Sequence, residues 1–214
     1  MSKKLFLISG LGANERMFQR LNFHNFETVY IKWISPEKNE TISDYASRLL
    51  PQINQENPII IGLSLGGMMA IEISKIIKTE KIILISSAKD KFEIPKLYQF
   101  AAYLNLNTLI PRQLYKKSNF FIYWLFGVKK REDKNLLKEV LRDTDLDFVV
   151  WAINEILNWK NVKVPENLFR IHGSNDHLLP MKVSTPDFEI KNGSHLMVLN
   201  KAEEVSEALK IILK

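Results

Sequence analysis

The stretch Ile61-Gly62-Leu63-Ser64-Leu65-Gly66-Gly67 is the most informative part of this sequence. It follows the apolar run 58–61, which is typical of a strand, and it opens a segment of helical character from Met68 to Ile77. A Gly-x-Ser-x-Gly sequence between a strand and a helix is typical of a nucleophile elbow, a tight turn that strains the serine backbone and exposes its hydroxyl. The sequence therefore predicts a nucleophilic Ser64 at the end of a strand.

Short runs that favour β-structure alternate with segments of helical periodicity along the chain. Continuous apolar stretches such as 82–85 suit strands that are buried on both faces. Alternation of this kind predicts an α/β fold, with a mostly parallel six-stranded sheet and helices on both faces. The predicted strands are Lys4–Ile8, Thr28–Ile34, Ile59–Ile61, Lys81–Ser86, Asn167–Ile171 and Asp187–Ile190.

Two helices of the sheet layer have clear sequence signals. Thr41-Ile42-Ser43-Asp44 predicts a capping box at a helix start. The apolar stripe that follows it consists of Ile42, Tyr45, Leu49 and Ile53. Near the end of the sequence, Val205, Ala208, Leu209 and Ile212 have the spacing of one buried helical face.

The region between about 90 and 165 contains no convincing strand. Its apolar spacing predicts helices over 97–106 and 114–126, and two further helical faces at 136–141 and 148–157. We interpret about 91–165 as a helical cap inserted into a single domain of residues 1–214. Its aromatic residues indicate an apolar acyl or aromatic substrate, or else form only the core of the cap; they are Phe100, Tyr103, Phe120, Phe121, Tyr123, Trp124 and Phe126.

Composition limits the possible functions. The chain has 214 residues, 46% of them hydrophobic and 25% charged, as in ordinary globular proteins. It has no cysteine, which excludes disulfides and thiolate chemistry. The formal net charge is +6, but the basic residues are dispersed, and no RNA-binding, helix-turn-helix or metal-ligand spacing is present. We therefore expect a small-molecule substrate, with no nucleic acid, no metal and no cofactor.

We expect a cytoplasmic protein without stable membrane insertion. The apolar run Leu5–Ile8 is shorter than the core of a signal peptide, and the aromatic run Phe120–Val128 is far shorter than the roughly 20 residues that span a bilayer. An alternative for 115–131 is an interfacial helix, because basic residues flank its aromatic centre. No pattern specifies the oligomeric state.

A nucleophilic serine needs a base, and the chain has four histidines. His195 follows the last predicted strand, which places it at the same edge of a parallel sheet as Ser64. His172 and His177 remain alternatives, whereas His24 has no acidic pattern nearby. We predict His195 as the base.

The base needs a carboxylate that orients it. Asp176 follows the penultimate predicted strand in Gly173-Ser174-Asn175-Asp176, although Asn and Asp also shape ordinary turns. We predict Asp176 as this carboxylate; Asp90 and Glu93, which follow the strand next to the elbow strand, are the rivals. Charge on a substrate oxygen would be met by the Leu65 backbone N–H and by a donor from the glycine turn Ser9–Gly12.

These segments resemble the α/β-hydrolase superfamily over nearly the whole chain. The order Ser64, Asp176, His195 matches the family's order of nucleophile, acid and base, and the helical insertion matches its cap. The resemblance implies an oxyanion hole formed by the amides of Leu11 and Leu65. Relative to the family, the sequence begins at the third strand, and Ser9 stands where many members carry histidine.

The resemblance implies a serine hydrolase that cleaves an ester or related acyl bond of a small, apolar substrate through an acyl-enzyme. The same fold also supports C–C bond hydrolysis, lyase and transferase reactions. A further alternative is a non-catalytic module that binds a ligand without cleaving it.

Overall fold

The computed structural model describes residues 3–103, 118–181 and 185–214. Six strands form one sheet in the order β2-β1-β3-β4-β5-β6, and every neighbouring pair is parallel. Each of the six predicted strands is present, although the second ends at Ile31 and the elbow strand extends to Leu63. Their bounds are β1 Lys4–Ile8, β2 Glu27–Ile31, β3 Ile59–Leu63, β4 Lys81–Ile85, β5 Leu168–Gly173 and β6 Phe188–Ile190.

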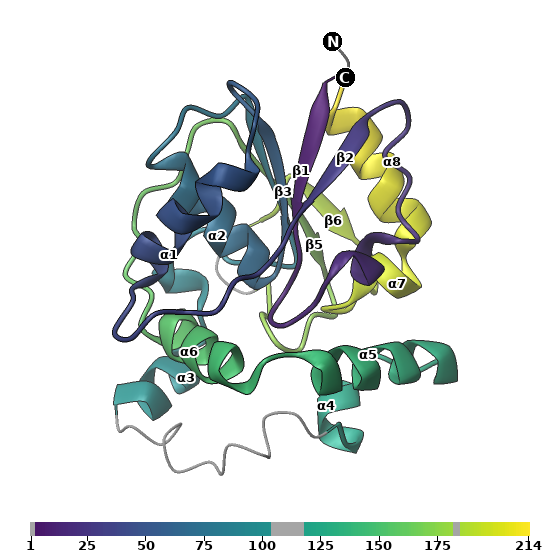
Figure 1. Ribbon diagram of the computed structural model, residues 1–214. Coiled ribbons are helices and arrows are strands. Elements are labelled where there is room, and N and C mark those ends of the chain that lie inside the picture. Colours follow the sequence, from purple (N-terminus) through teal and green to yellow (C-terminus); the bar gives the residue numbers. More distant parts are fainter. Residues whose placement is uncertain (1–2, 104–117, 182–184) are drawn as a thin grey trace.

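The sheet separates two hydrophobic layers. Side chains alternate along each strand, so Leu5 and Leu7 belong to one cluster while Phe6 and Ile8 belong to the other. Helices α7 (Met197–Asn200) and α8 (Ala202–Ile212) cover the first face, and α1 (Ile42–Leu49) and α2 (Leu65–Ser74) cover the second (Figure 1). The prediction of helices on both faces is confirmed.

The predictions for the two helices of the sheet layer are also confirmed. Thr41 and Asp44 form the predicted capping box at the start of α1, where the Thr41 hydroxyl oxygen accepts a hydrogen bond from the Asp44 N–H at 3.2 Å. The predicted stripe is buried as far as Leu49, and Ile53 lies beyond the helix end and is partly buried. All four predicted residues of α8 are buried.

The described residues between β4 and β5 form no strand, and we call this region, which contains four α-helices, the cap. They are α3 Lys96–Tyr103, α4 Phe120–Leu125, α5 Arg131–Asp143 and α6 Leu146–Leu157. The predicted helix over 97–106 is confirmed as far as Tyr103, and its last residues lie outside the described ones. The predicted helix over 114–126 is described only from residue 118 and is helical from Phe120. The cap lies beyond the edge of the sheet that is remote from both termini (Figure 1).

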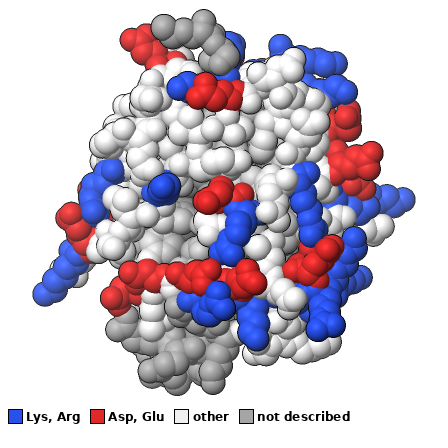
Figure 2. Space-filling model, turned by 45° about the vertical axis from the view of Figure 1, so that its right-hand side comes forward, with Lys and Arg blue, Asp and Glu red and all other residues white. Residues whose placement is uncertain are grey.

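The surface charges are mixed. On the face that Figure 2 shows, Lys and Arg side chains are interspersed with Asp and Glu and form no large basic patch, as expected for dispersed basic residues. Lys3 and Glu80 form an ion pair at the surface, with 2.7 Å between Nζ and Oε1. No helix in the described part of the chain combines the length and apolar character required to cross a bilayer.

The topology places the ends of β1 and β3 at a switch point. The chain leaves β1 toward β2 on one side, and β3 pairs with β1 on the other. In open α/β sheets, the loops at such a point diverge and leave a crevice at the carboxyl ends of the strands. The Ser9–Gly12 turn and the Ser64 elbow both begin there.

Two glycines make the elbow possible. A Cβ atom on Gly62 would lie 2.3 Å from Gly66 O, and one on Gly66 would lie 2.1 Å from Ile8 O. Both contacts are with backbone, which cannot move aside without displacing β1 or α2. The strand, the elbow and the helix can therefore approach this closely only when these positions carry no side chain.

This packing predicts that Gly66→Ala destabilises the protein by at least about 2 kcal/mol, because overpacking against backbone is costly. Gly10→Ala is the matched control, since a Cβ there would make its nearest contact, with Ser64 Cβ, at an ordinary 3.5 Å. We expect that control to change stability by less than about 0.5 kcal/mol. Urea unfolding of both variants measures the difference; equal stabilities would contradict the steric argument.

Candidate active site

Ser64 occupies the turn between β3 and α2. Its φ of +53° and ψ of −119° lie in a region that non-glycine residues rarely adopt. The turn is held by the Ser64 N–H, which donates to Ile85 O on β4 at 2.9 Å, and by the Ser87 hydroxyl, which donates to Ser64 O at 2.6 Å. The geometry of a nucleophile elbow is therefore present, with the strain that such a turn imposes on its serine.

The structure brings Ser64, His195 and Asp176 together. His195 Nε2 lies 2.9 Å from Ser64 Oγ, and His195 Nδ1 lies 2.9 Å from Asp176 Oδ2. A carboxylate only accepts hydrogen bonds, so Nδ1 carries the proton and Nε2 is free to accept one from the serine hydroxyl. The three side chains come from the loops after β3, β5 and β6, which meet at one edge of the sheet.

Asp176 is buried and firmly fixed. Its Oδ1 accepts hydrogen bonds from the backbone N–H groups of Leu178 and Leu179, at 2.9 and 2.8 Å. Burial alone would raise the pKa of Asp176, but electrostatic attraction to His195 and hydrogen bonds from His172 and His195 outweigh it and hold that pKa well below its usual range. Asp176 is therefore an anion at neutral pH, as an orienting carboxylate must be.

The alternative histidines have other partners. His172 is fully buried on β5, and its Nε2 donates to Leu179 O at 2.8 Å while lying 3.4 Å from Asp176 Oδ2. His172 thus lies beside the carboxylate. His177 stacks on Trp124 of α4, with ring centroids 4.4 Å apart, and its Nδ1 lies 3.1 Å from Trp124 O.

Asp90 and Glu93, the alternatives to Asp176, form hydrogen bonds and ion pairs with other groups. Asp90 accepts from the Phe92 N–H and so caps the 3-10 helix η3 (Lys91–Glu93). Glu93 forms a buried ion pair with Arg170, 2.7 Å between Oε1 and Nη1. Arg170 Nη2 in turn lies 3.5 Å from His172 Nδ1. This buried series of charged and polar groups extends to the neighbourhood of Asp176, and sequence reasoning missed it.

Two backbone N–H groups in the cavity of Ser64 are free to donate a hydrogen bond to a ligand. Among the described residues, neither the Leu11 nor the Leu65 N–H donates a hydrogen bond to another protein group. Leu65 is the first residue of α2, where the helix dipole is positive. Gly10 approaches Ser64 closely, and a Cβ there would lie 3.5 Å from Ser64 Cβ. Both amides belong to residues that line the same cavity as Ser64.

That cavity has a volume of about 380 Å³ and lies between the sheet edge and the cap. Its polar side chains are those of Ser64, His195 and Tyr98. Burial raises the pKa of Tyr98, and the negative charge of Asp176 adds to this shift. The apolar lining from the cap is mostly aliphatic and comprises Ile94, Ile122, Phe126, Leu137, Val140, Leu141, Val149, Ile153, Ile156 and Leu157.

Most aromatic side chains of the cap neither line the cavity nor form a core of the cap, the two roles predicted from the sequence. The side chains of Phe100, Phe120, Phe121 and Trp124 are 58%, 84%, 60% and 49% exposed, so these four neither line the cavity nor form a buried core. Phe126 does line the cavity, and its ring meets that of His195 edge-on with centroids 5.5 Å apart. Tyr123 packs partly buried against the core, and the side chain of Tyr103 lies outside the described residues. Aliphatic positions in α5 and α6 supply the lining instead.

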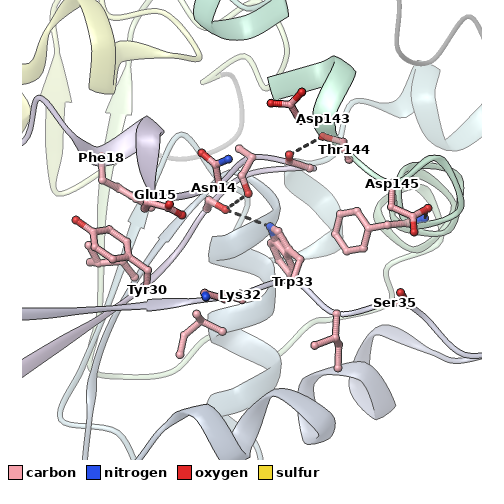
Figure 3. A pocket seen from close by; sticks show the side chains of 17 residues that line it. Asn14, Glu15, Phe18, Tyr30, Lys32, Trp33, Ser35, Asp143, Thr144 and Asp145 are labelled. Atoms are coloured by element: carbon pink, nitrogen blue, oxygen red, sulfur yellow. Dashed lines mark hydrogen bonds between the residues drawn. The ribbon is translucent and has the colours of Figure 1, made fainter. Parts of the chain in front are cut away.

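A second cavity, of about 330 Å³, lies behind the turn after β1 (Figure 3). Trp33 and Thr144 point from its walls toward this turn (Figure 3). The Trp33 indole N–H donates to Ser9 Oγ and Gly10 O, at 3.1 and 3.2 Å, and the Thr144 hydroxyl lies 2.6 Å from Gly12 O. No sequence pattern indicated these contacts.

In residues 3–103, 118–181 and 185–214, no three His, Asp or Glu side chains gather in a way that could hold a metal ion.

Comparisons with known proteins address the fold. No protein-family model matches the sequence, and no curated protein matches it either. Solved structures do match. A thermophilic esterase from Thermogutta terrifontis aligns with a TM-score of 0.73 at 15% identity, over 100% of this chain and 90% of its own.

Two further structures agree with this match. A hydrolase from Pseudomonas aeruginosa aligns with a TM-score of 0.74 at 13% identity, over 99% of this chain and 90% of its own. A bromoperoxidase from Bacillus anthracis aligns with a TM-score of 0.69 at 16% identity, over 100% and 92%. The protein therefore has the α/β-hydrolase fold; at these identities the likeness is one of fold.

The environment of Asp176 predicts a pH dependence of stability. Its pKa in the folded protein is below that of an unfolded aspartate, about 3.9. Its ionised form therefore contributes stability that is present above about pH 4 and is lost as the pH falls toward the folded-state pKa. We expect the free energy of unfolding to fall between about pH 5 and pH 2, and to fall less steeply in Asp176→Asn.

Urea unfolding at a series of pH values measures this difference. Glu56→Gln, at an exposed carboxylate, is the control and should keep the slope of the unmodified protein. An Asp176→Asn slope equal to that of the control would contradict the assignment.

Proposed function

We propose that the protein is a serine hydrolase that cleaves esters or related acyl bonds of substrates with an apolar acyl group. The observation that carries this proposal is the hydrogen-bonded series Ser64–His195–Asp176 at the floor of an apolar cavity. The same three side chains were predicted from the sequence, and nothing in folding requires them to meet.

In the first half of the reaction, Ser64 Oγ attacks the substrate carbonyl carbon while its proton passes to His195 Nε2. Asp176 stabilises the imidazolium that results. The carbonyl oxygen becomes negatively charged, and the N–H groups of Leu11 and Leu65 donate to it. His195 then gives its proton to the leaving oxygen or sulfur, the bond to the carbonyl carbon breaks, and Ser64 is left acylated.

In the second half, a water molecule replaces the leaving group. His195 Nε2 takes a proton from the water as its oxygen attacks the acyl carbon. The bond from that carbon to Ser64 Oγ breaks, and the proton returns from His195 to the serine. The products are a carboxylic acid and the unchanged enzyme, so no cofactor is consumed.

The cavity favours an aliphatic acyl group. Among the described residues that line it, only Ser64, His195 and Tyr98 have polar side chains, while α5 and α6 contribute Leu, Ile and Val. A charged or strongly polar group placed against these side chains would lose its hydration without gaining hydrogen bonds. A volume of about 380 Å³ lies in the usual range for small-molecule sites.

The esterase and hydrolase among the similar structures support this proposal, although one fold serves many reactions. The bromoperoxidase is an example of another named activity on the same fold. Experiments on Ser64 and on the cavity distinguish ester hydrolysis from these alternatives.

Reaction with a fluorophosphonate probe tests the nucleophile. We expect one covalent adduct, on Ser64, because among the residues that the structure describes only that hydroxyl has a base within hydrogen-bonding distance in a strained turn. Ser64→Ala should remove the adduct and lower turnover of a p-nitrophenyl ester by at least about 10³-fold. Mass spectrometry and initial rates measure both, with Ser43→Ala, at an exposed position of α1, as the control.

The outcomes separate the candidate functions. An unlabelled Ser64 in folded protein would contradict the proposal. Labelling without turnover of any acyl ester would favour C–C hydrolysis, lyase or transferase chemistry. Ligand binding that Ser64→Ala leaves unchanged, with no labelling and no turnover, would favour a non-catalytic module.

Narrowing the cavity tests the acyl site. Ile153, on α6, lines it, so Ile153→Trp should exclude long acyl chains. We expect kcat/KM for an octanoyl ester to fall at least about 10-fold relative to that for an acetyl ester. The longer chain would lose its contacts with the cavity wall, and each methylene that a pocket binds stabilises the transition state. Ile211→Trp, at a 55% exposed position on α8, is the matched control and should leave the ratio unchanged. An unchanged ratio in Ile153→Trp would place the acyl chain elsewhere.

A further inference from the structure

The turn after β1 presents its two faces to two different cavities. Gly10 and Leu11 line the cavity that contains Ser64, whereas Ser9 and Gly12 line the second cavity behind the turn. The Ala13 N–H closes the turn by donating to Gly10 O at 3.0 Å, and Gly12 has the positive φ, +62°, that such a turn requires at its third residue. The orientation of the Gly10–Leu11 peptide decides where the Leu11 N–H points.

A trans peptide holds its C=O and its N–H on opposite sides. Gly10 O is directed toward Trp33, which lines the second cavity, because it accepts a hydrogen bond from the indole N–H of that residue at 3.2 Å. The Leu11 N–H belongs to the same peptide and therefore points away from Trp33. It has no protein acceptor among the described residues, and Leu11 lines the cavity of Ser64.

We propose that Trp33 is a positioning residue for the reaction at Ser64: its indole N–H, by holding Gly10 O, directs the Leu11 N–H to the substrate oxygen. This inference rests on the proposed function, because it assigns a role within that site. Trp33 lies beyond the end of β2 and touches no reacting atom; it acts through one peptide plane.

Trp33 is itself held in place. Its ring packs against Phe148 of α6 and Tyr45 of α1, with centroids 5.1 and 6.1 Å apart. Its N–H is shared between Gly10 O and Ser9 Oγ, and the Ser9 hydroxyl donates to Ala13 O. The Trp33 N–H thus meets two acceptors on the turn, Ser9 Oγ and Gly10 O, while its ring is packed in an aromatic cluster.

Fixed orientation matters because such a donor stabilises the transition state only when it is already in place as charge develops. Without the Trp33 donor, the Gly10–Leu11 peptide keeps only the Ala13 N–H on its carbonyl and is freer to rotate. Displacement of a positioned group by about 1 Å can cost on the order of 10²-fold in rate. Substrate binding in the apolar cavity should not change.

Trp33→Phe removes the donor and keeps a ring in the cluster. We expect kcat for a p-nitrophenyl ester to fall about 10- to 100-fold with KM nearly unchanged. Affinity for a trifluoromethyl ketone, which forms an oxyanion on Ser64, should fall by a similar factor. Affinity for a methyl ketone of the same chain length, measured in Ser64→Ala, should not depend on position 33.

The chain offers a matched control in Trp151→Phe. Trp151 stacks on the same Tyr45, with centroids 4.3 Å apart, but its indole N–H donates to Glu40 O at 2.8 Å, away from the turn. We expect this variant to lose stability to a similar extent and to keep its kcat. If Trp33→Phe unfolds, Trp33→3-benzothienylalanine keeps the ring shape and replaces the N–H by sulfur.

Equal kcat in the Trp33 and Trp151 variants would overturn the inference, as would a loss confined to KM. A parallel loss of kcat and of trifluoromethyl ketone affinity at position 33 alone supports it. A different result would contradict the proposed function itself: no fluorophosphonate adduct on Ser64 and no ester turnover in the unmodified protein.

Discussion

The close approach of backbone to backbone around Ser64 is the constraint on which the site depends. The positive φ of Ser64 is kept because glycines at 62 and 66 let β3 and α2 approach each other and β1 within distances that no side chain permits. The Ser64 amide and carbonyl are held by Ile85 and Ser87 at the end of β4. Folding of the sheet therefore imposes the strain, and the strain presents the hydroxyl at the edge where the other loops end.

Parallel strands supply the rest of that edge. The loops after β5 and β6 bring a buried carboxylate and a buried imidazole to the hydroxyl, and the loop after β1 brings an amide. Burial of Asp176 would by itself oppose its charge, and its two histidine neighbours outweigh this effect and keep it ionised. The proposed chemistry thus rests on polar groups that the fold, and not the solvent, satisfies.

Apolar and polar functions are divided between the cap and the sheet. The cap provides an aliphatic roof from α5 and α6, while the sheet edge provides every group that the proposed mechanism protonates or charges. The two parts are joined at the turn after β1, where Thr144 of the cap meets Gly12 and Trp33 meets Gly10. One short turn therefore contacts both the cap and the aromatic side chain of Trp33.

The sequence itself determined much of the fold and part of the candidate site. Local rules suffice for the elbow around Ser64, the six strands and the capping box at Thr41, because each depends on neighbours within a few residues. The sequence also narrowed the acid to a few candidates. Only the tertiary structure decided that Glu93 pairs with Arg170 while Asp176 meets His195, that the cap presents aliphatic side chains to the cavity, and that Trp33 holds Gly10 O. Those outcomes depend on which side chains the folded chain brings together across large separations in sequence, and no local spacing records them.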